Sequence, residues 1–175
     1  MMFFRWVLAA VFAGLIATAS QAGDQYIDGT GYAVSGYDVV AFFDLPQSKV
    51  GHTQSKAVPG RADLTTNYNG AKFAFSSAAN LERFLANPAK YAPQYDGHCA
   101  YGVAQGNKVP GNPNLWRIVG GKLYLNITKA VNKTWEQDIP GYLRQSGSKW
   151  AGRLEPKQAS HDAVPAFRSK APLAD

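Results

Sequence analysis

Two stretches of the chain have a strand-like mixture of apolar and polar side chains, and each stretch is interrupted by a tight, glycine-containing turn. Residues 64–75 contain an Asn-Gly pair at their centre, and residues 115–125 contain a Gly-Gly pair. Such pairs between strand-like segments are typical of two-residue hairpin turns. Phe73 and Phe75 share one face because side chains alternate along a strand. The pattern therefore predicts two antiparallel β-hairpins.

A helical pattern follows each hairpin. The first helix is predicted after Ser76 or Ser77, whose hydroxyl can cap a free backbone N–H, and it ends at Asn87, because the residue before a proline avoids helical geometry. The apolar positions at helical spacing are Ala78, Leu81, Phe84 and Leu85. The second helix is predicted over residues 128–149, broken or bent at Pro140-Gly141. We expect one packed cluster of Phe73, Phe75, Leu81, Phe84 and Tyr91.

Twice, then, the chain runs strand, turn, strand, helix, although the two passages are too different to count as a sequence repeat. This order predicts an α+β fold, with a small antiparallel sheet of hairpins and two main helices packed on it. Residues 45–60 contain prolines, glycines and many polar side chains, which is typical of a loop. The domain is predicted over residues 23–150. Residues 151–175 lack periodicity and are predicted to form a disordered tail.

The first residues have the pattern of an export signal. Arg5 precedes an apolar stretch over residues 6–17, and Ser20-Gln21-Ala22 places small residues where a signal peptidase reads them. Residues 1–22 are therefore predicted to be a signal peptide, and the protein to be periplasmic or secreted without a transmembrane anchor after cleavage. An uncleaved anchor is the alternative, although the stretch is shorter than the ~20 residues of a membrane span.

Composition supports a folded, exported domain and limits its partners. Charged residues make up 17% of the 175 residues and aromatic residues 13%, which is typical of a packed core. The formal net charge is +6, but the basic residues are scattered and form no dense run. We therefore expect no nucleic-acid partner. The pattern identifies no protein partner.

The chain has a single cysteine, Cys99, directly after His98. A thiol and an imidazole suit copper or zinc, and His52 is the other histidine in the predicted domain, so the metal hypothesis names Cys99, His98 and His52. Asp38 and Asp96 are candidate oxygen donors. The first alternative is that Cys99 is core packing, because free cysteine is often buried. The second, a thiol enzyme, lacks a recognisable partner residue or a second cysteine.

Several segments together resemble the YHS domain family. The hairpin with its serine over residues 68–76 and the helix end over residues 84–91 resemble the family's core. Residues 36–43, 93–100 and 121–126 resemble its exported, single-domain branch. In metal-linked members a cysteine follows the hairpin where Ser76 or Ser77 stands here, whereas the exported branch places its cysteine at Cys99. The resemblance implies a non-enzymatic binding or accessory protein, with a metal ion, copper first, as the ligand to test.

Overall fold

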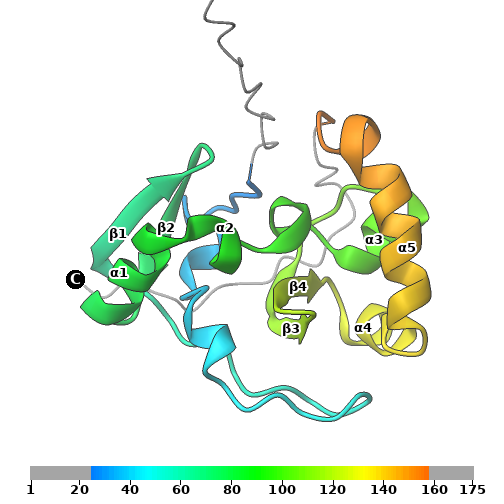
Figure 1. The fold of residues 1–175 in the computed structure, drawn as a ribbon, viewed down its shortest axis with the longest axis horizontal. Coiled ribbons are helices and arrows are strands. Elements are labelled where there is room, and N and C mark those ends of the chain that lie inside the picture. Colours follow the sequence, from blue (N-terminus) through cyan, green and yellow to red (C-terminus); the bar gives the residue numbers. More distant parts are fainter. Residues whose placement is uncertain (1–24, 158–175) are drawn as a thin grey trace, which may run out of the picture.

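The computed structural model describes residues 25–157, so the predicted signal peptide and residues 158–175 of the predicted tail lie outside the described residues. Two hairpins, each followed by helices, form the framework (Figure 1). The elements are β1 (Arg61–Tyr68), β2 (Ala71–Phe75), α1 (Ala78–Ala86), α2 (Pro88–Tyr91), α3 (Ala100–Gln105), β3 (Asn112–Val119), β4 (Lys122–Asn126), α4 (Lys129–Trp135) and α5 (Ile139–Lys149). Short turns are η1 (Val34–Gly36), η2 (Ala41–Phe43), η3 (Gln94–Gly97) and η4 (Trp150–Leu154).

The α+β class is confirmed, but the strands form two separate sheets. Within the described residues β1 pairs only with β2, and β3 only with β4, both antiparallel. The hairpin of β1 and β2 lies with α1 towards one end of the molecule, while α3, α4 and α5 gather at the other end (Figure 1). The two sheets share no edge. The segment that contains η1 and η2 contacts both of them, with η1 against β2 and β3 and η2 against β3.

The predicted helix over residues 128–149 is two helices. Thr128 caps α4 by accepting a hydrogen bond from the N–H of Val131, and Asp138 caps α5 by accepting one from the N–H of Gly141. The predicted break is confirmed, but it falls before Pro140, between Trp135 and Ile139. Proline lies in the first turn of α5, where its missing N–H is not needed, so it starts a helix instead of bending one.

The predicted core cluster is confirmed, with one correction. Phe73, Phe75 and Phe84 are fully buried, Tyr91 is buried, and Leu81 packs against them from the surface of the cluster. The assignment of Ala78 and Leu85 to the buried face of α1 was wrong, since Ala78 is exposed and 56% of Leu85 is exposed. One residue along a helix rotates the side chain by about 100°, and the buried face of α1 is centred on Phe84.

The packed chain continues past residue 150, where the tail was expected to begin. Leu154 is buried, and the Nζ of Lys108 donates a hydrogen bond to the carbonyl of Glu155 at 2.7 Å. The same Nζ lies 5.2 Å from the centre of the Trp150 ring. These contacts hold η4 against the domain. In the part of the chain that the structure describes, no helix is long and apolar enough to cross a bilayer.

The two hairpins belong to two structurally equivalent units. The first unit comprises residues 34–86 and the second unit residues 95–135. Each begins with three consecutive residues of positive φ that end in glycine, namely Val34, Ser35 and Gly36 in the first unit and Tyr95, Asp96 and Gly97 in the second. Non-glycine residues rarely adopt this left-handed geometry. Two such runs at corresponding places therefore indicate a shared backbone design.

The same backbone hydrogen bonds connect each left-handed turn to the start of its hairpin. The N–H of Gly60 donates to the carbonyl of Gly36 at 2.9 Å, and that of Gly111 donates to the carbonyl of Gly97 at 3.0 Å. One further pair of equivalent bonds comprises Asp38 N–H to Val58 at 2.9 Å and Cys99 N–H to Val109 at 2.8 Å. Asp38 and Cys99 therefore occupy equivalent positions, and each precedes a short helical segment.

The close approach of the hairpin requires glycine at the same place in both units. A Cβ on Gly60 would lie 2.6 Å from the Cβ of Ala74, and a Cβ on Gly111 would lie 2.7 Å from the Cβ of Leu125. Carbon atoms do not pack at these distances, so only glycine fits without a shift. This second shared constraint supports the equivalence of the two units.

Candidate functional site

Cys99 is the N-cap of α3 and is fully buried. Its Sγ accepts a hydrogen bond from the N–H of Gly102 at 3.3 Å and donates one to the Oδ1 of Asn126 at 3.4 Å. Burial raises the pKa of the thiol above its usual value, because removal from water disfavours the thiolate. Cys99 is therefore a neutral thiol with both its donor and its acceptor engaged.

Asn126 extends this contact into a link between three elements. Its Oδ1 also accepts a hydrogen bond from the N–H of Tyr101 at 3.1 Å, and its Nδ2 donates to the Oδ1 of Asn132 at 3.0 Å. The start of α3, the end of β4 and helix α4 are thus joined by side chains. We call this group of Cys99, Asn126 and Asn132 the thiol–amide link.

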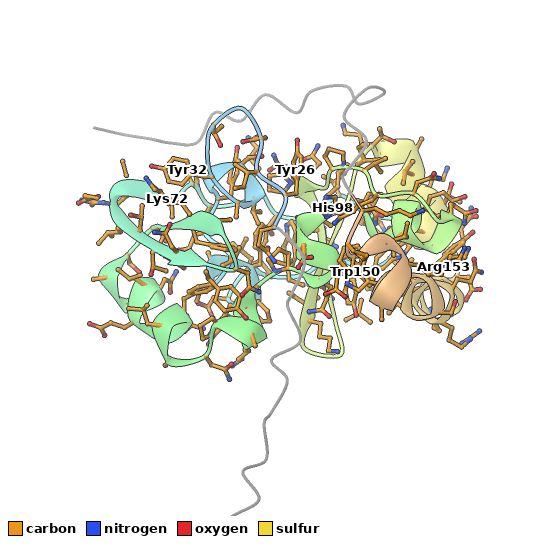
Figure 2. All side chains as sticks on the ribbon, turned by 90° about the horizontal axis from the view of Figure 1, so that it is seen from above. Tyr26, Tyr32, Lys72, His98, Trp150 and Arg153 are labelled. Atoms are coloured by element: carbon orange, nitrogen blue, oxygen red, sulfur yellow. The ribbon has the colours of Figure 1, made fainter. Side chains whose placement is uncertain are left out.

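His98 is also buried, but it faces a different environment from Cys99. Its Nδ1 lies 2.8 Å from the carbonyl oxygen of Tyr95, which identifies this nitrogen as the donor. Its ring lies between those of Tyr26 and Trp150, with centre-to-centre distances of 5.6 and 6.1 Å (Figure 2). The backbone of His98 is extended, so neighbouring side chains point to opposite sides. The two adjacent residues therefore do not converge on one point.

The third predicted ligand, His52, is exposed in the loop before β1. Among residues 25–157, no three or more His, Cys, Asp and Glu side chains lie close enough together to hold a metal ion. Cys99 offers a protonated sulfur that already caps a helix, whereas a metal requires a thiolate. The residues at this place do not fit a metal, so binding by Cys99, His98 and His52 stays a prediction without geometric support.

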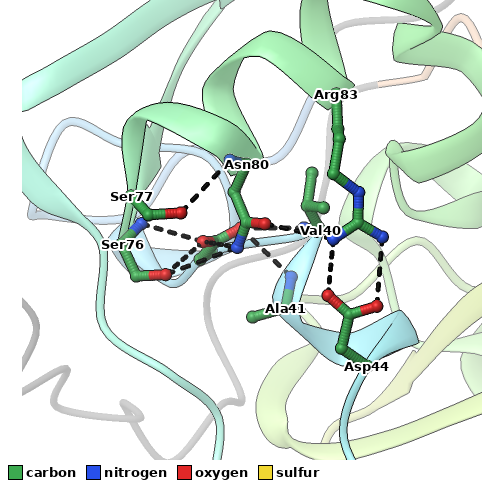
Figure 3. A network of polar contacts seen from close by, with 8 residues as sticks. Val40, Ala41, Asp44, Ser76, Ser77, Asn80 and Arg83 are labelled. Carbon is green, nitrogen blue, oxygen red and sulfur yellow. Dashed lines mark hydrogen bonds and ion pairs between the residues drawn. The ribbon is translucent and has the colours of Figure 1, made fainter.

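The first unit has a buried carboxylate where the second has its thiol. Asp38 is fully buried, and its Oδ1 accepts hydrogen bonds from the N–H groups of Val40 at 2.9 Å and Ala41 at 3.2 Å. Its Oδ2 accepts from the N–H and Oγ–H of Ser76 at 2.8 and 2.6 Å, and from the Nδ2 of Asn80 at 2.7 Å (Figure 3). We call this group of Asp38, Ser76 and Asn80 the carboxylate link.

The carboxylate link explains the serine that follows the first hairpin. The resemblance implies a metal-binding cysteine at Ser76 or Ser77 in metal-linked family members. Here Ser76 donates to Asp38, and Ser77 caps α1 by accepting from the N–H of Asn80 at 3.2 Å. Both positions hold the fold together and leave no soft donor for a metal. The sequence identifies Asp38 only as a candidate oxygen donor for a metal, whereas in the structure it is a buried acceptor that joins three segments.

A buried ion pair fixes the loop over residues 45–60 to the second unit. The Nε and Nη2 of Arg117 donate to the Oε1 of Glu136 at 2.8 and 2.6 Å, and both side chains are about 95% buried or more. The Oε2 of Glu136 accepts the N–H of Gly51 at 2.8 Å, while Arg117 also donates to the carbonyl of Ser48 at 3.2 Å. All these hydrogen-bond partners belong to the chain itself, so the ion pair positions the loop.

Comparison with known proteins agrees with the family resemblance. No curated protein and no solved structure matches the chain. A family model does match, over residues 50–95, which include β1, β2 and α1 of the first unit and the following α2. Apart from its first residue, the second unit lies outside the matched segment. The predicted family is thereby confirmed for this segment, and the chain contains a YHS domain.

Proposed function

We propose that this chain is an exported YHS-domain protein with a non-enzymatic binding or accessory role, in which Cys99 is a structural residue. The observation that carries the proposal is the thiol–amide link. Its sulfur caps α3 and contacts Asn126, and it has no exposed surface. A residue committed in this way stabilises the junction of α3, β4 and α4. Binding must then use the surface of the domain.

A thiol enzyme is disfavoured by the state of the sulfur. A nucleophilic cysteine needs a lowered pKa and an accessible thiolate, whereas burial raises the pKa of Cys99. His98 contacts the carbonyl of Tyr95 with its Nδ1 and packs against Tyr26 and Trp150. In the folded protein the thiol should react with Ellman's reagent many-fold more slowly than after unfolding in guanidinium chloride.

Metal binding is the hypothesis that this proposal competes with, since YHS domains are often associated with copper handling. The test is titration of the wild type, Cys99→Ser and the control His52→Ala with Cu(I), Cu(II) and Zn(II), together with circular dichroism. The proposal predicts the same metal affinity for all three proteins, because neither Cys99 nor His52 is a ligand. Serine retains the donor and acceptor of the cap, so the Cys99→Ser variant should keep its fold. Loss of tight binding in Cys99→Ser alone, with the fold intact, would contradict a structural role.

Export rests on the pattern of residues 1–22 and has its own test. Protein recovered from a periplasmic or secreted fraction should begin at Gly23, because cleavage after Ala22 follows the small-residue rule. Membrane-bound protein that retains Met1 would show that the segment is an anchor and would remove export of a free domain from the proposal.

A further inference from the structure

The charges of the described chain are distributed unevenly. We call residues 25–96 the N-terminal half and residues 97–157 the C-terminal half. The N-terminal half has six Lys and Arg residues and six Asp and Glu residues, so its charges balance. The C-terminal half has nine Lys and Arg residues but only three acidic ones, Glu136, Asp138 and Glu155. The excess positive charge of the described residues therefore belongs to one half.

The two halves also differ in how their cations are partnered. In the N-terminal half, Arg61 pairs with Asp63 at 2.7 Å and Arg83 pairs with Asp44 at 2.5 Å. In the C-terminal half, Glu136 is used by the buried Arg117 and cannot neutralise the surface. Six exposed cations there form no ion pair with any residue in the range 25–157, namely Lys122, Lys129, Lys133, Arg144, Arg153 and Lys157.

Helix α4 concentrates two of these cations. Lys129 and Lys133 are both exposed and lie four residues apart, so they are neighbours on one helix face. Like charges at this spacing destabilise a helix slightly, and α4 has no acidic residue to offset them. Because α3, α4 and α5 form one end of the molecule (Figure 1), the unpaired charges produce a positive potential at that end.

We propose that this cationic end binds the surface of a bilayer that contains anionic phospholipid. The choice of a lipid surface over an acidic protein rests on the apolar residues. Protein interfaces have an apolar, aromatic-rich centre, but the exposed large hydrophobic residues of the described chain are Ile27, Val50 and Leu85, all in the N-terminal half. A headgroup layer attracts cations by charge alone. The inference deepens the proposed binding role by naming a partner, and it does not involve Cys99.

The test is co-sedimentation of the full chain with vesicles of phosphatidylcholine that contain 0, 20 or 40% phosphatidylglycerol. The double variant Lys129→Gln/Lys133→Gln is compared with the matched control Lys56→Gln/Lys72→Gln, which removes the same charge from the N-terminal half. All proteins carry the same residues 1–24, so any contribution of that segment cancels. The vesicle binding due to residues 1–24 is also measured directly, on vesicles of phosphatidylcholine alone.

Wild-type binding should rise with the phosphatidylglycerol fraction and fall as salt is added. A lysine near an anionic surface contributes about fivefold in binding, so the α4 variant should lose about 25-fold and the control much less. Equal losses in both variants would overturn the assignment to this end of the molecule. Binding that is independent of phosphatidylglycerol, or that occurs with polyglutamate but not with vesicles, would overturn the lipid partner. The metal titration above is unaffected by either result.

Discussion

The two units of the molecule share a backbone but join their elements with different chemistry. In the first unit the second residue after the left-handed turn is Asp38, whose carboxylate accepts hydrogen bonds from the start of η2, the end of β2 and α1. In the second unit the equivalent residue is Cys99, whose thiol contacts the start of α3 and the amide of Asn126. A charged link and a neutral link thus perform the same task.

This difference shows that the position needs a hydrogen-bond acceptor for the N–H groups that follow it. The acceptor atom can be oxygen or sulfur. A carboxylate supplies two oxygens and joins three segments directly. A thiol supplies one weak acceptor and one weak donor, so Asn126 and Asn132 complete the connection. The cysteine of the second unit is therefore explained by capping and packing, in the same way as the aspartate of the first.

The largest expected effect comes from the core of the first unit. Phe84→Ala should lower the free energy of unfolding by roughly 3–5 kcal/mol, because it removes a fully buried ring from the cluster. Leu85→Ala, one position along the same helix, should cost under about 0.5 kcal/mol, because surface substitutions rarely cost more. Denaturation in guanidinium chloride measures both, and similar losses would contradict the described face of α1.

The ion pairs provide the next comparison, between a buried pair and an exposed one. Glu136→Gln should cost about 3–5 kcal/mol, because it leaves the buried guanidinium of Arg117 without a counter-charge. A compensating pair, Arg117→Met with Glu136→Met, should recover most of this loss, since apolar residues tolerate the site. Urea denaturation of the single and double variants tests this, and an additive loss would contradict it.

Removal of the carboxylate link should cost more than removal of the thiol. Asp38→Ala leaves buried donors of Ser76 and Asn80 without an acceptor and should cost about 3 kcal/mol. Cys99→Ser keeps a donor and an acceptor and should cost about 1 kcal/mol or less. Thermal unfolding, with circular dichroism to verify the fold, ranks the two variants. The reverse order would show that the two links are not equivalent in role.

The smallest effect is the pH dependence of the exposed pair. Hydrogen bonds from Arg83 hold the pKa of Asp44 below its usual value. Because the pKa is lower in the folded state, the pair stabilises the protein above the usual carboxyl pKa, and this contribution is lost as pH falls through the folded pKa. Both side chains are partly exposed, so Asp44→Asn should cost under about 1 kcal/mol at pH 7. Unfolding at pH 7 and pH 3 should show the variant and wild type converging at the lower pH.

The elements with strong local signals were predicted from the sequence. Both hairpins follow from strand-like segments around Asn-Gly and Gly-Gly, and α1 from its periodicity and the proline beyond it. Helix α3 was missed, because it has six residues and its cap is a cysteine, which is not a usual capping residue. The repeated order of strand, turn, strand and helix was visible in the sequence. The residue-by-residue equivalence of the two units was not, since it is carried by backbone angles and hydrogen bonds that different side chains satisfy.

The candidate site was harder to predict for a physical reason. Adjacent His98 and Cys99 suggest a shared ligand, but an extended backbone directs them apart and burial keeps the thiol protonated. Burial and side-chain direction depend on long-range packing, such as the contact of Cys99 with Asn126. Asp38 carried one usable signal, a carboxylate immediately before an apolar segment that begins with a helical turn, which is a typical capping position.

The equivalent hydrogen bonds that close each unit also bear on how the chain can be re-engineered. The bond from Asp38 to Val58 closes a connection about twice as long as the one closed by Cys99 and Val109. Doubling a flexible loop costs only about 0.6 kcal/mol in closure entropy, and the longer connection is in addition held by Arg117 and Glu136. Gly106 and Asn107 of the shorter connection are exposed and precede the buried Lys108, so the site between them is a natural place to graft a reporter peptide or a binding sequence.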